Sequence, residues 1–108
     1  MKNIIMLFSV LVVSVFVSVT VATAKEQGKT GEALFKQHCS LCHPDGGNNV
    51  NSQKTLHKKD REANGVKAVS DIVGKMRNPG TGMTKFDEQT VPDTDAKTIA
   101  EYILKTFK

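Results

Sequence analysis

The sequence predicts a small all-α domain in which about four helices alternate with long loops. Apolar residues after residue 25 recur at helical spacing, and no segment there alternates apolar and polar residues as a strand would. Loops rich in glycine and asparagine, at residues 44–49 and 78–82, separate the helical segments. With 108 residues, the chain has room for one domain.

The first helix is expected over residues 30–38. Thr30 is a suitable N-cap, and the carboxylate of Glu32 complements the positive end of the helix dipole. Leu34 and Phe35 mark the apolar face that would be buried. The sequence therefore gives this helix both a defined start and a side that must pack against a partner.

Two further helices are expected after the first loop. A short polar helix should occupy residues 56–64 and end at Gly65. Ser70 would cap the next helix, with Asp71 in its first turn. Its apolar residues at helical spacing are Ile72, Val73 and Met76.

The last helix is expected to begin at Pro92 and Asp93 and to run to about Phe107. Its apolar side chains fall on one side: Ala96, Ile99, Tyr102, Ile103 and Phe107. A chain this small with only 6% aromatic residues has little core of its own. Long loops in so small a domain suggest that they wrap a flat apolar group.

Cys39, Cys42 and His43 form a Cys-x-x-Cys-His motif at the end of the first helix. Two cysteines three residues apart lie on one side of a helical turn, so both thiols can add to the vinyl groups of one porphyrin. The adjoining imidazole then points toward the iron. This motif is the attachment signature of c-type haem, and it predicts one covalently bound haem c with His43 as an axial ligand.

Two other interpretations of the cysteine pair compete with haem attachment. A structural disulfide would suit an oxidising compartment, but it explains neither the close spacing nor His43. A thioredoxin-like dithiol would need a βαβ pattern around the motif, which the sequence lacks. A structural or thiol module without haem therefore remains the weaker alternative.

The N-terminal segment has the pattern of a signal peptide. Lys2 is followed by a charge-free, strongly apolar stretch that closes with Ala22-Thr23-Ala24, an Ala-x-Ala cleavage site. We expect residues 1–24 to be removed, leaving residues 25–108 as a monohaem domain in the periplasm. An uncleaved membrane anchor is the alternative, because the apolar stretch is long enough to span a bilayer.

The charge balance is modestly basic, with a formal net charge of +4. Such an excess favours redox partner proteins with acidic docking surfaces and is too weak and scattered to indicate nucleic acid. Four lysines are candidates to ring the exposed haem edge: Lys36, Lys54, Lys75 and Lys85. A solvated surface explains the same lysines equally well. A monomer is the expected state for so small a carrier.

The second axial ligand has four candidates. Met83 lies in a glycine-rich loop that can bend to present its thioether, and it is preferred. Met76 lies on the apolar face of a helix, where methionine usually fills a core. His57, between polar residues, is the main competitor, whereas His38 precedes the motif on the proximal side and should lie on a helix surface.

The identity of that ligand decides the function. A thioether is a soft donor, so methionine and histidine together raise the reduction potential and leave no open position on the iron. The sequence therefore predicts a one-electron carrier and not an enzyme. A haem protein that binds peroxide or a gas through a labile sixth ligand is the alternative.

Over residues 25–108 the chain resembles the class I cytochrome c family, and within it the small photosynthetic-type soluble cytochromes. The resemblance is carried by the haem motif with Gly31 and Phe35 before it, by Gly82-Met83, and by Ala100-Glu101-Tyr102-Ile103; the loops at 46–50 and 54–56 match the photosynthetic-type group. The resemblance implies one haem c held by His43 and Met83, and first and last helices that cross closely at Gly31, with Phe35 near Ile99 and Tyr102.

Three positions depart from the family pattern, and one of them is Asn51, which stands where an apolar residue that packs on the haem is common. Met83 is followed by Thr84, where the family usually has proline, so the resemblance implies a less rigid loop here. The family also has a proline whose carbonyl accepts the N–H of the haem histidine. Ser52 stands at that position, and its backbone carbonyl is expected to accept the bond instead.

Overall fold

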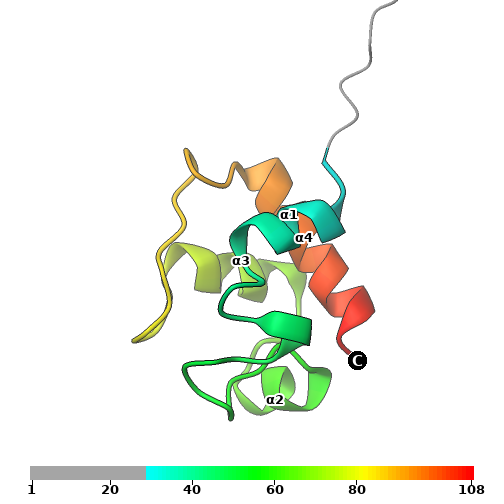
Figure 1. Ribbon diagram of the computed structural model, residues 1–108, viewed down its shortest axis with the longest axis vertical. Helices are drawn as coiled ribbons and strands as arrows, with labels where there is room; N and C mark the ends of the chain where they lie inside the picture. Colours follow the sequence, from blue (N-terminus) through cyan, green and yellow to red (C-terminus); the bar gives the residue numbers. More distant parts are fainter. Residues whose placement is uncertain (1–28) are drawn as a thin grey trace, which may run out of the picture.

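A computed structural model of the protein describes residues 29–108, and these residues are helical with no strand, as predicted (Figure 1). The predicted signal peptide, residues 1–24, lies outside the described residues. Within residues 29–108, no helix is long and apolar enough to span a bilayer. The elements are α1 (Gly31–His38), a 3₁₀ helix η1 (Pro44–Gly46), α2 (Lys58–Ala63), α3 (Val69–Arg77) and α4 (Asp93–Thr106).

α1 begins as the sequence predicts. The Thr30 hydroxyl accepts a hydrogen bond from the backbone N–H of Ala33 at 3.2 Å, and Glu32 lies in the first turn. The helix ends at His38, so that Cys39 is its C-cap. The haem motif therefore starts where the helix stops.

α3 begins differently from the prediction. Ala68 is the N-cap residue, and the predicted cap by Ser70 is wrong. The carboxylate of Asp71 accepts the backbone N–H groups of Lys67 and Ala68, at 3.0 and 2.8 Å. A carboxylate one turn into the helix thus replaces a side-chain cap, and it also lies at the positive end of the helix dipole.

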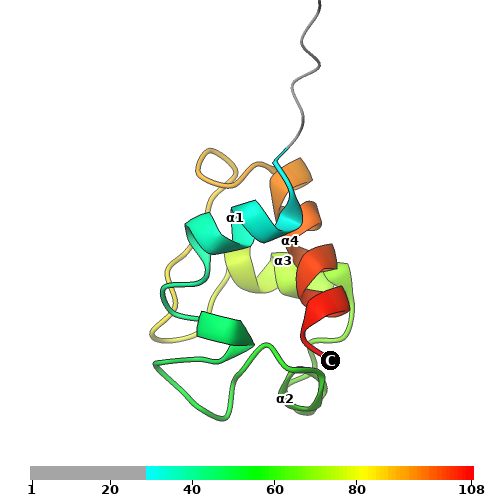
Figure 2. The same ribbon diagram turned by 45° about the vertical axis from the view of Figure 1, so that its right-hand side comes forward.

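α2 is shorter than predicted, ending at Ala63 with Asn64 as its C-cap. Gly65 follows with φ +74, a left-handed conformation that stops the helix without strain. The chain then turns toward α3. Figure 2 shows α2 at the end of the molecule away from the start of α1.

α1 crosses α4 at close range, and Gly31 makes the crossing possible (Figures 1 and 2). A Cβ atom at Gly31 would lie 2.7 Å from the Cβ of Tyr102 and 2.9 Å from the carbonyl oxygen of Thr98. The ring of Phe35 lies 5.4 Å from that of Tyr102 and 5.3 Å from that of Phe107. The close crossing that the resemblance implied is therefore confirmed.

The core lies where α1, α3 and α4 meet. Its buried members are Leu34, Phe35, Ile72, Met76, Val91, Ala96, Ile99, Ala100, Ile103 and Phe107. Every apolar position predicted for the face of α4 contributes to it, with Tyr102 half-buried beside the core. This cluster leaves the loops on the other side of the molecule to form a separate region.

Arg77 fastens the long segment between α3 and α4. Its Nη1 donates to the carbonyl oxygens of Phe86 and Val91, at 3.1 and 2.9 Å, and its Nη2 lies 2.6 Å from a carboxylate oxygen of Asp93. The backbone N–H of Phe86 also donates to the carbonyl of Met76 at 2.9 Å. Arg77, which precedes the segment that carries Met83, is thus bonded to residues that follow Met83.

Candidate functional site

A cavity of about 570 Å³ lies between the two long loops. It is lined by the haem motif, the loop at 48–56, parts of α2 and α3, and the segment at 80–86. Cys39, Cys42, His43 and Met83 all line it. The structure therefore brings together all four site residues that the sequence predicts.

The two cysteines are free thiols that border this cavity. Cys39 is half-buried and Cys42 is exposed, and neither forms a disulfide. Burial raises the pKa of the Cys39 thiol to about 11. A structural disulfide, the simplest alternative for the pair, is thus absent between them.

His43 is held by a backbone carbonyl. Its Nδ1 lies 2.8 Å from the carbonyl oxygen of Gly47. A carbonyl can only accept, so Nδ1 carries the proton and Nε2 keeps its lone pair. The prediction that the carbonyl of Ser52 accepts this bond is therefore wrong. The chain turns back so soon after His43 that the carbonyl of Gly47 accepts it instead.

Gly46 makes that early turn possible. It has φ +79 and is buried, and a Cβ there would lie 2.4 Å from the Phe107 ring. Only glycine fits a left-handed backbone pressed against an aromatic ring. The turn that supplies the carbonyl of Gly47 thus rests on the C-terminal end of α4.

The loop at 48–56 is built from side-chain hydrogen bonds to its own backbone. The Asn48 carbonyl oxygen accepts the N–H groups of Val50 and Asn51, both at 2.9 Å, and its amide donates to the carbonyl of Lys54 at 2.8 Å. The Asn49 amide donates to the carbonyl of Leu41 at 3.2 Å. These bonds shape one wall of the cavity without a buried core of its own.

Met83 is half-buried at the cavity wall. Gly82 before it has φ +90, and a Cβ there would lie 2.7 Å from a methyl of Val50. The Met83 segment and the loop at 48–56 therefore approach each other closely at this point. The left-handed glycine lets the chain pass Val50 and present Met83 at the cavity.

The other three ligand candidates lie in different environments. Met76 borders the cavity but is 4% exposed and packed in the core, as its helical position predicts. His57 is exposed, does not line the cavity, and lies edge-on to Phe107 with ring centres 5.8 Å apart. His38 is half-buried and not the surface residue expected; it lines the cavity, 6.1 Å from the ring of Phe86.

The rest of the lining suits a flat apolar group that carries a metal. Its apolar members include Leu56, Val66, Ile72, Phe86 and Ile103. The lining residues that can bond to a prosthetic group or to its metal are two thiols, one imidazole with an available Nε2, and one thioether. Sulfur and imidazole donors suit iron, so the residues fit a haem attached through Cys39 and Cys42.

The comparisons with known proteins agree with this donor set. The family model described as cytochrome c oxidase, cbb3-type, subunit III, matches residues 26–103. Cytochrome c6 of Cyanidium caldarium is 31% identical over 103 residues, covering 95% of this chain and 92% of that protein. The chain belongs to the class I, cytochrome c6-like family.

Solved structures related to this cytochrome share its fold. OmcF, the outer membrane cytochrome F of Geobacter sulfurreducens, is 47% identical, with a TM-score of 0.70 over 72% of this chain and 99% of that one. Cytochrome c6C from a Synechococcus strain is 25% identical, with a TM-score of 0.68 over 73% and 95%. As a member of this family, the cytochrome carries covalently bound haem c with iron.

The four lysines predicted for the haem edge do not form one group. Lys54 and Lys75 line the cavity that Cys39, Cys42, His43 and Met83 also line. Lys36 is one turn from Glu32 and forms an exposed ion pair with it at 2.9 Å. Lys85 is exposed beside Phe86 and does not line the cavity.

Sequence reasoning missed the residues that support the site. The sequence predicts only a loop for Gly47, Asn48 and Asn49, yet the carbonyl of Gly47 positions His43, and the amides of Asn48 and Asn49 shape one wall of the cavity. Arg61 was also missed, although it borders the cavity and is 5% exposed. The glycine and asparagine content signalled a tight loop, but a single arginine in a polar helix gave no signal of burial.

Proposed function

We propose that this cytochrome carries single electrons between redox partner proteins in the periplasm. In this proposal Cys39 and Cys42 hold haem c through thioether bonds, and His43 and Met83 are its axial ligands. The observation that carries the assignment is the bond from Nδ1 of His43 to Gly47, which leaves Nε2 available at a cavity that Met83 also lines.

The chain's own residues do three things in this function. The carbonyl of Gly47 fixes the tautomer and orientation of His43. The thioether of Met83 favours ferrous iron and so raises the reduction potential. The apolar walls exclude water and preserve that preference. The haem supplies a one-electron couple between ferric and ferrous iron.

The partner surface is proposed around the cavity mouth. Lys54 and Lys75 line the cavity and are exposed, and Lys85 lies nearby along the Met83 segment. Positive side chains there would steer a partner with an acidic surface and speed its association. We propose that the cytochrome acts as a monomer and reaches the periplasm through the leader at residues 1–24, which is then cleaved.

An optical redox titration of the haem-loaded protein tests this function. We expect a reversible one-electron transition, with the near-red absorption band of methionine bound to ferric iron present at neutral pH. A protein without that band would contradict Met83 as a ligand, and one that turns over peroxide would contradict the carrier function.

Carbon monoxide separates the carrier from the alternative, a peroxide- or gas-binding haem protein. That alternative needs a labile Met83, and Thr84 in place of proline is the feature that favours it. The clamp by Arg77 at both ends of the segment opposes it. We expect no rapid carbon monoxide binding to the reduced protein.

A further inference from the structure

Arg61 is the one polar or charged residue buried among residues 29–108, with 5% of its surface exposed. Its Nε donates to the carbonyl of Leu56 at 2.7 Å, and its Nη2 donates to the carbonyl of Phe107 at 3.2 Å. These two bonds join α2 to the end of α4. They fix the position of the guanidinium, and no carboxylate side chain of residues 29–108 forms an ion pair with it.

Several donors of Arg61 remain after these bonds. A guanidinium has five N–H groups, and none of the ion pairs within residues 29–108 includes Arg61. No buried nitrogen or oxygen of a side chain lacks a partner in that part of the chain. Since Nη1 of Arg61 has no hydrogen bond there, it must reach accessible space.

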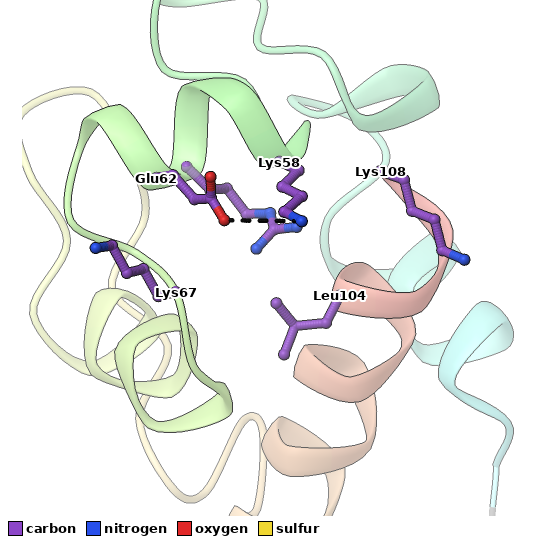
Figure 3. Close-up of a pocket in the computed structure, with 6 residues that line it drawn as sticks. Lys58, Glu62, Lys67, Leu104 and Lys108 are labelled. Carbon is purple, nitrogen blue, oxygen red and sulfur yellow. Dashed lines mark ion pairs between the residues drawn. The ribbon is translucent and has the colours of Figure 1, made fainter.

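A second pocket, of about 370 Å³, borders Arg61 away from the haem motif. We call it the basic pocket; its lining residues are Lys58, Arg61, Glu62, Lys67, Leu104 and Lys108. Figure 3 shows Lys58 and Glu62 pointing toward each other, with Nζ and Oε1 4.0 Å apart, whereas the amines of Lys67 and Lys108 point outward on opposite sides of the pocket. Four cations and one carboxylate give the pocket a clear positive excess.

We propose that the basic pocket binds a small oxyanion, with the chemistry of a phosphate or carboxylate, and that Arg61 is its anchor. A guanidinium offers parallel N–H groups to two oxygens of such an anion. Because backbone carbonyls hold Arg61 in place, little side-chain entropy is lost on binding. The flexible amines of Lys67 and Lys108 can then turn inward and close on the anion from opposite sides.

The anion would also act on the haem. Arg61 lines the haem cavity as well as the basic pocket, so its charge lies in the wall between them. An anion that neutralises this charge stabilises the ferric state, which is one unit more positive than the ferrous state. By linkage, the anion binds the ferric protein more tightly and lowers the reduction potential. This second half of the inference depends on the proposed electron-carrier function.

Calorimetry on the ferric haem-loaded protein tests the binding site, with inorganic phosphate as the probe and chloride adjusted to keep ionic strength constant. We expect one saturable site. Lys67→Gln should weaken it about threefold to fivefold and Arg61→Gln at least tenfold. Lys59→Gln removes an exposed charge from α2 outside both pockets and should leave the affinity unchanged.

A parallel titration with acetate shows whether the pocket takes a carboxylate as well as a phosphate. Saturable binding of either anion that is weakened by Lys67→Gln supports the site. No saturable binding of either overturns it, and so does equal weakening by Lys59→Gln, which would indicate general charge screening. Lys67 is exposed, so its variant decides the matter even where Arg61→Gln fails to fold.

Redox titrations with and without saturating phosphate test the coupling. A threefold tighter affinity for the ferric protein lowers the potential by about 28 mV, since a tenfold ratio corresponds to about 59 mV for one electron. An unchanged potential despite phosphate binding overturns the coupling. Failure of the carrier function is distinct, because it would appear as peroxide turnover or rapid carbon monoxide binding in the protein without added phosphate.

Discussion

The two halves of this cytochrome are stabilised in different ways. Where α1 crosses α4, Leu34, Ile99 and Ala100 are 1% exposed or less, and three aromatic rings meet at centre distances of 5.3 to 5.9 Å. On the cavity side, Leu41 and Val50 remain 87% and 61% exposed. The helical half, formed by α1, α3 and α4, completes its own packing. The loop half, formed by the haem motif, the loop at 48–56 and the segment at 80–86, presents apolar side chains to the cavity.

The difference shows how a short chain positions a large prosthetic group. The loop half takes its shape from hydrogen bonds of Asn48, Asn49 and His43 to backbone carbonyls. Apolar burial there is left for the haem to supply. Variants in the helical half should therefore change the stability of the fold, and variants in the loop half should change the properties of the haem.

Met83→Ala tests the loop half and has the largest expected effect. Loss of the thioether should abolish the near-red absorption band. It should also lower the reduction potential by on the order of 0.1 V, a fraction of the range of about 0.8 V that axial ligands span. Optical spectra and redox titration of the haem-loaded variant measure both.

Met76→Ala is the matched control from the helical half. Met76 is buried in the core, so the variant should lose about 2–5 kcal/mol of unfolding free energy while keeping the band. If Met76→Ala loses the band and Met83→Ala keeps it, the ligand assignment is wrong.

Gly46→Ala tests the point where the two halves touch. The added Cβ would meet the Phe107 ring at 2.4 Å on a backbone with φ +79. Strain and overpacking together should cost about 2–4 kcal/mol of unfolding free energy, measured by denaturant titration.

Gly65→Ala provides the comparison, because Gly65 has φ +74 but no atom within 4 Å of its added Cβ. The Gly65→Ala variant should lose about 1–2 kcal/mol of unfolding free energy, from backbone strain alone. Equal losses in the two variants would show that the Phe107 contact does not join the halves.

Gly31→Ala tests the helix crossing alone. A Cβ within 2.7 Å of Tyr102 must push α1 from α4, at a cost of about 1–3 kcal/mol in thermal or denaturant unfolding. Gly74→Ala, in α3 with nothing within 4 Å, should instead stabilise the protein by about 0.5–1 kcal/mol. Changes of the same sign in both would contradict the packing argument.

Asp71→Asn has the smallest expected effect and depends on pH. Hydrogen bonds from the N–H groups of Ala68 and Lys67 lower the pKa of the Asp71 carboxyl. Its ionised form therefore stabilises the fold above the ordinary Asp pKa of about 3.9, and this contribution is lost as pH falls through the lowered pKa. The wild type should exceed Asp71→Asn in unfolding free energy at neutral pH, and the difference should shrink in acid.

A difference that stays constant from neutral to acid pH would contradict this account of Asp71. Denaturant titrations of both proteins across that range provide the measurement. Since Asp71 begins α3 in the helical half, the visible spectrum of the haem should be the same in both proteins at neutral pH.

Much of the helical half could be predicted from the sequence. Helical spacing located the buried face of α4, and Thr30 marked the start of α1, because both signals are local. The start of α3 was missed because Asp71 caps it from inside the helix while Ala68 occupies the cap position. When a side chain inside the helix bonds back to the residues before it, the residue at the cap position itself gives no sign of the cap.

The sequence predicted four of the residues that line the cavity of the loop half, but not how the loop is folded. Cys39, Cys42, His43 and Met83 line one cavity, yet the acceptor for His43 is Gly47 and not Ser52. A carbonyl is present at every residue, so only the path of the chain decides which one is reached. The burial of Arg61 likewise depends on the end of α4, which is distant in sequence.

The mass of the exported protein tests the central claim most directly. After denaturation and acid–acetone extraction, the mature chain should keep its colour and weigh one haem more than the polypeptide of residues 25–108. The variant with both Cys39→Ser and Cys42→Ser should lose that added mass. A wild-type chain with the mass of polypeptide alone would contradict the account of the cavity, its ligands and its function.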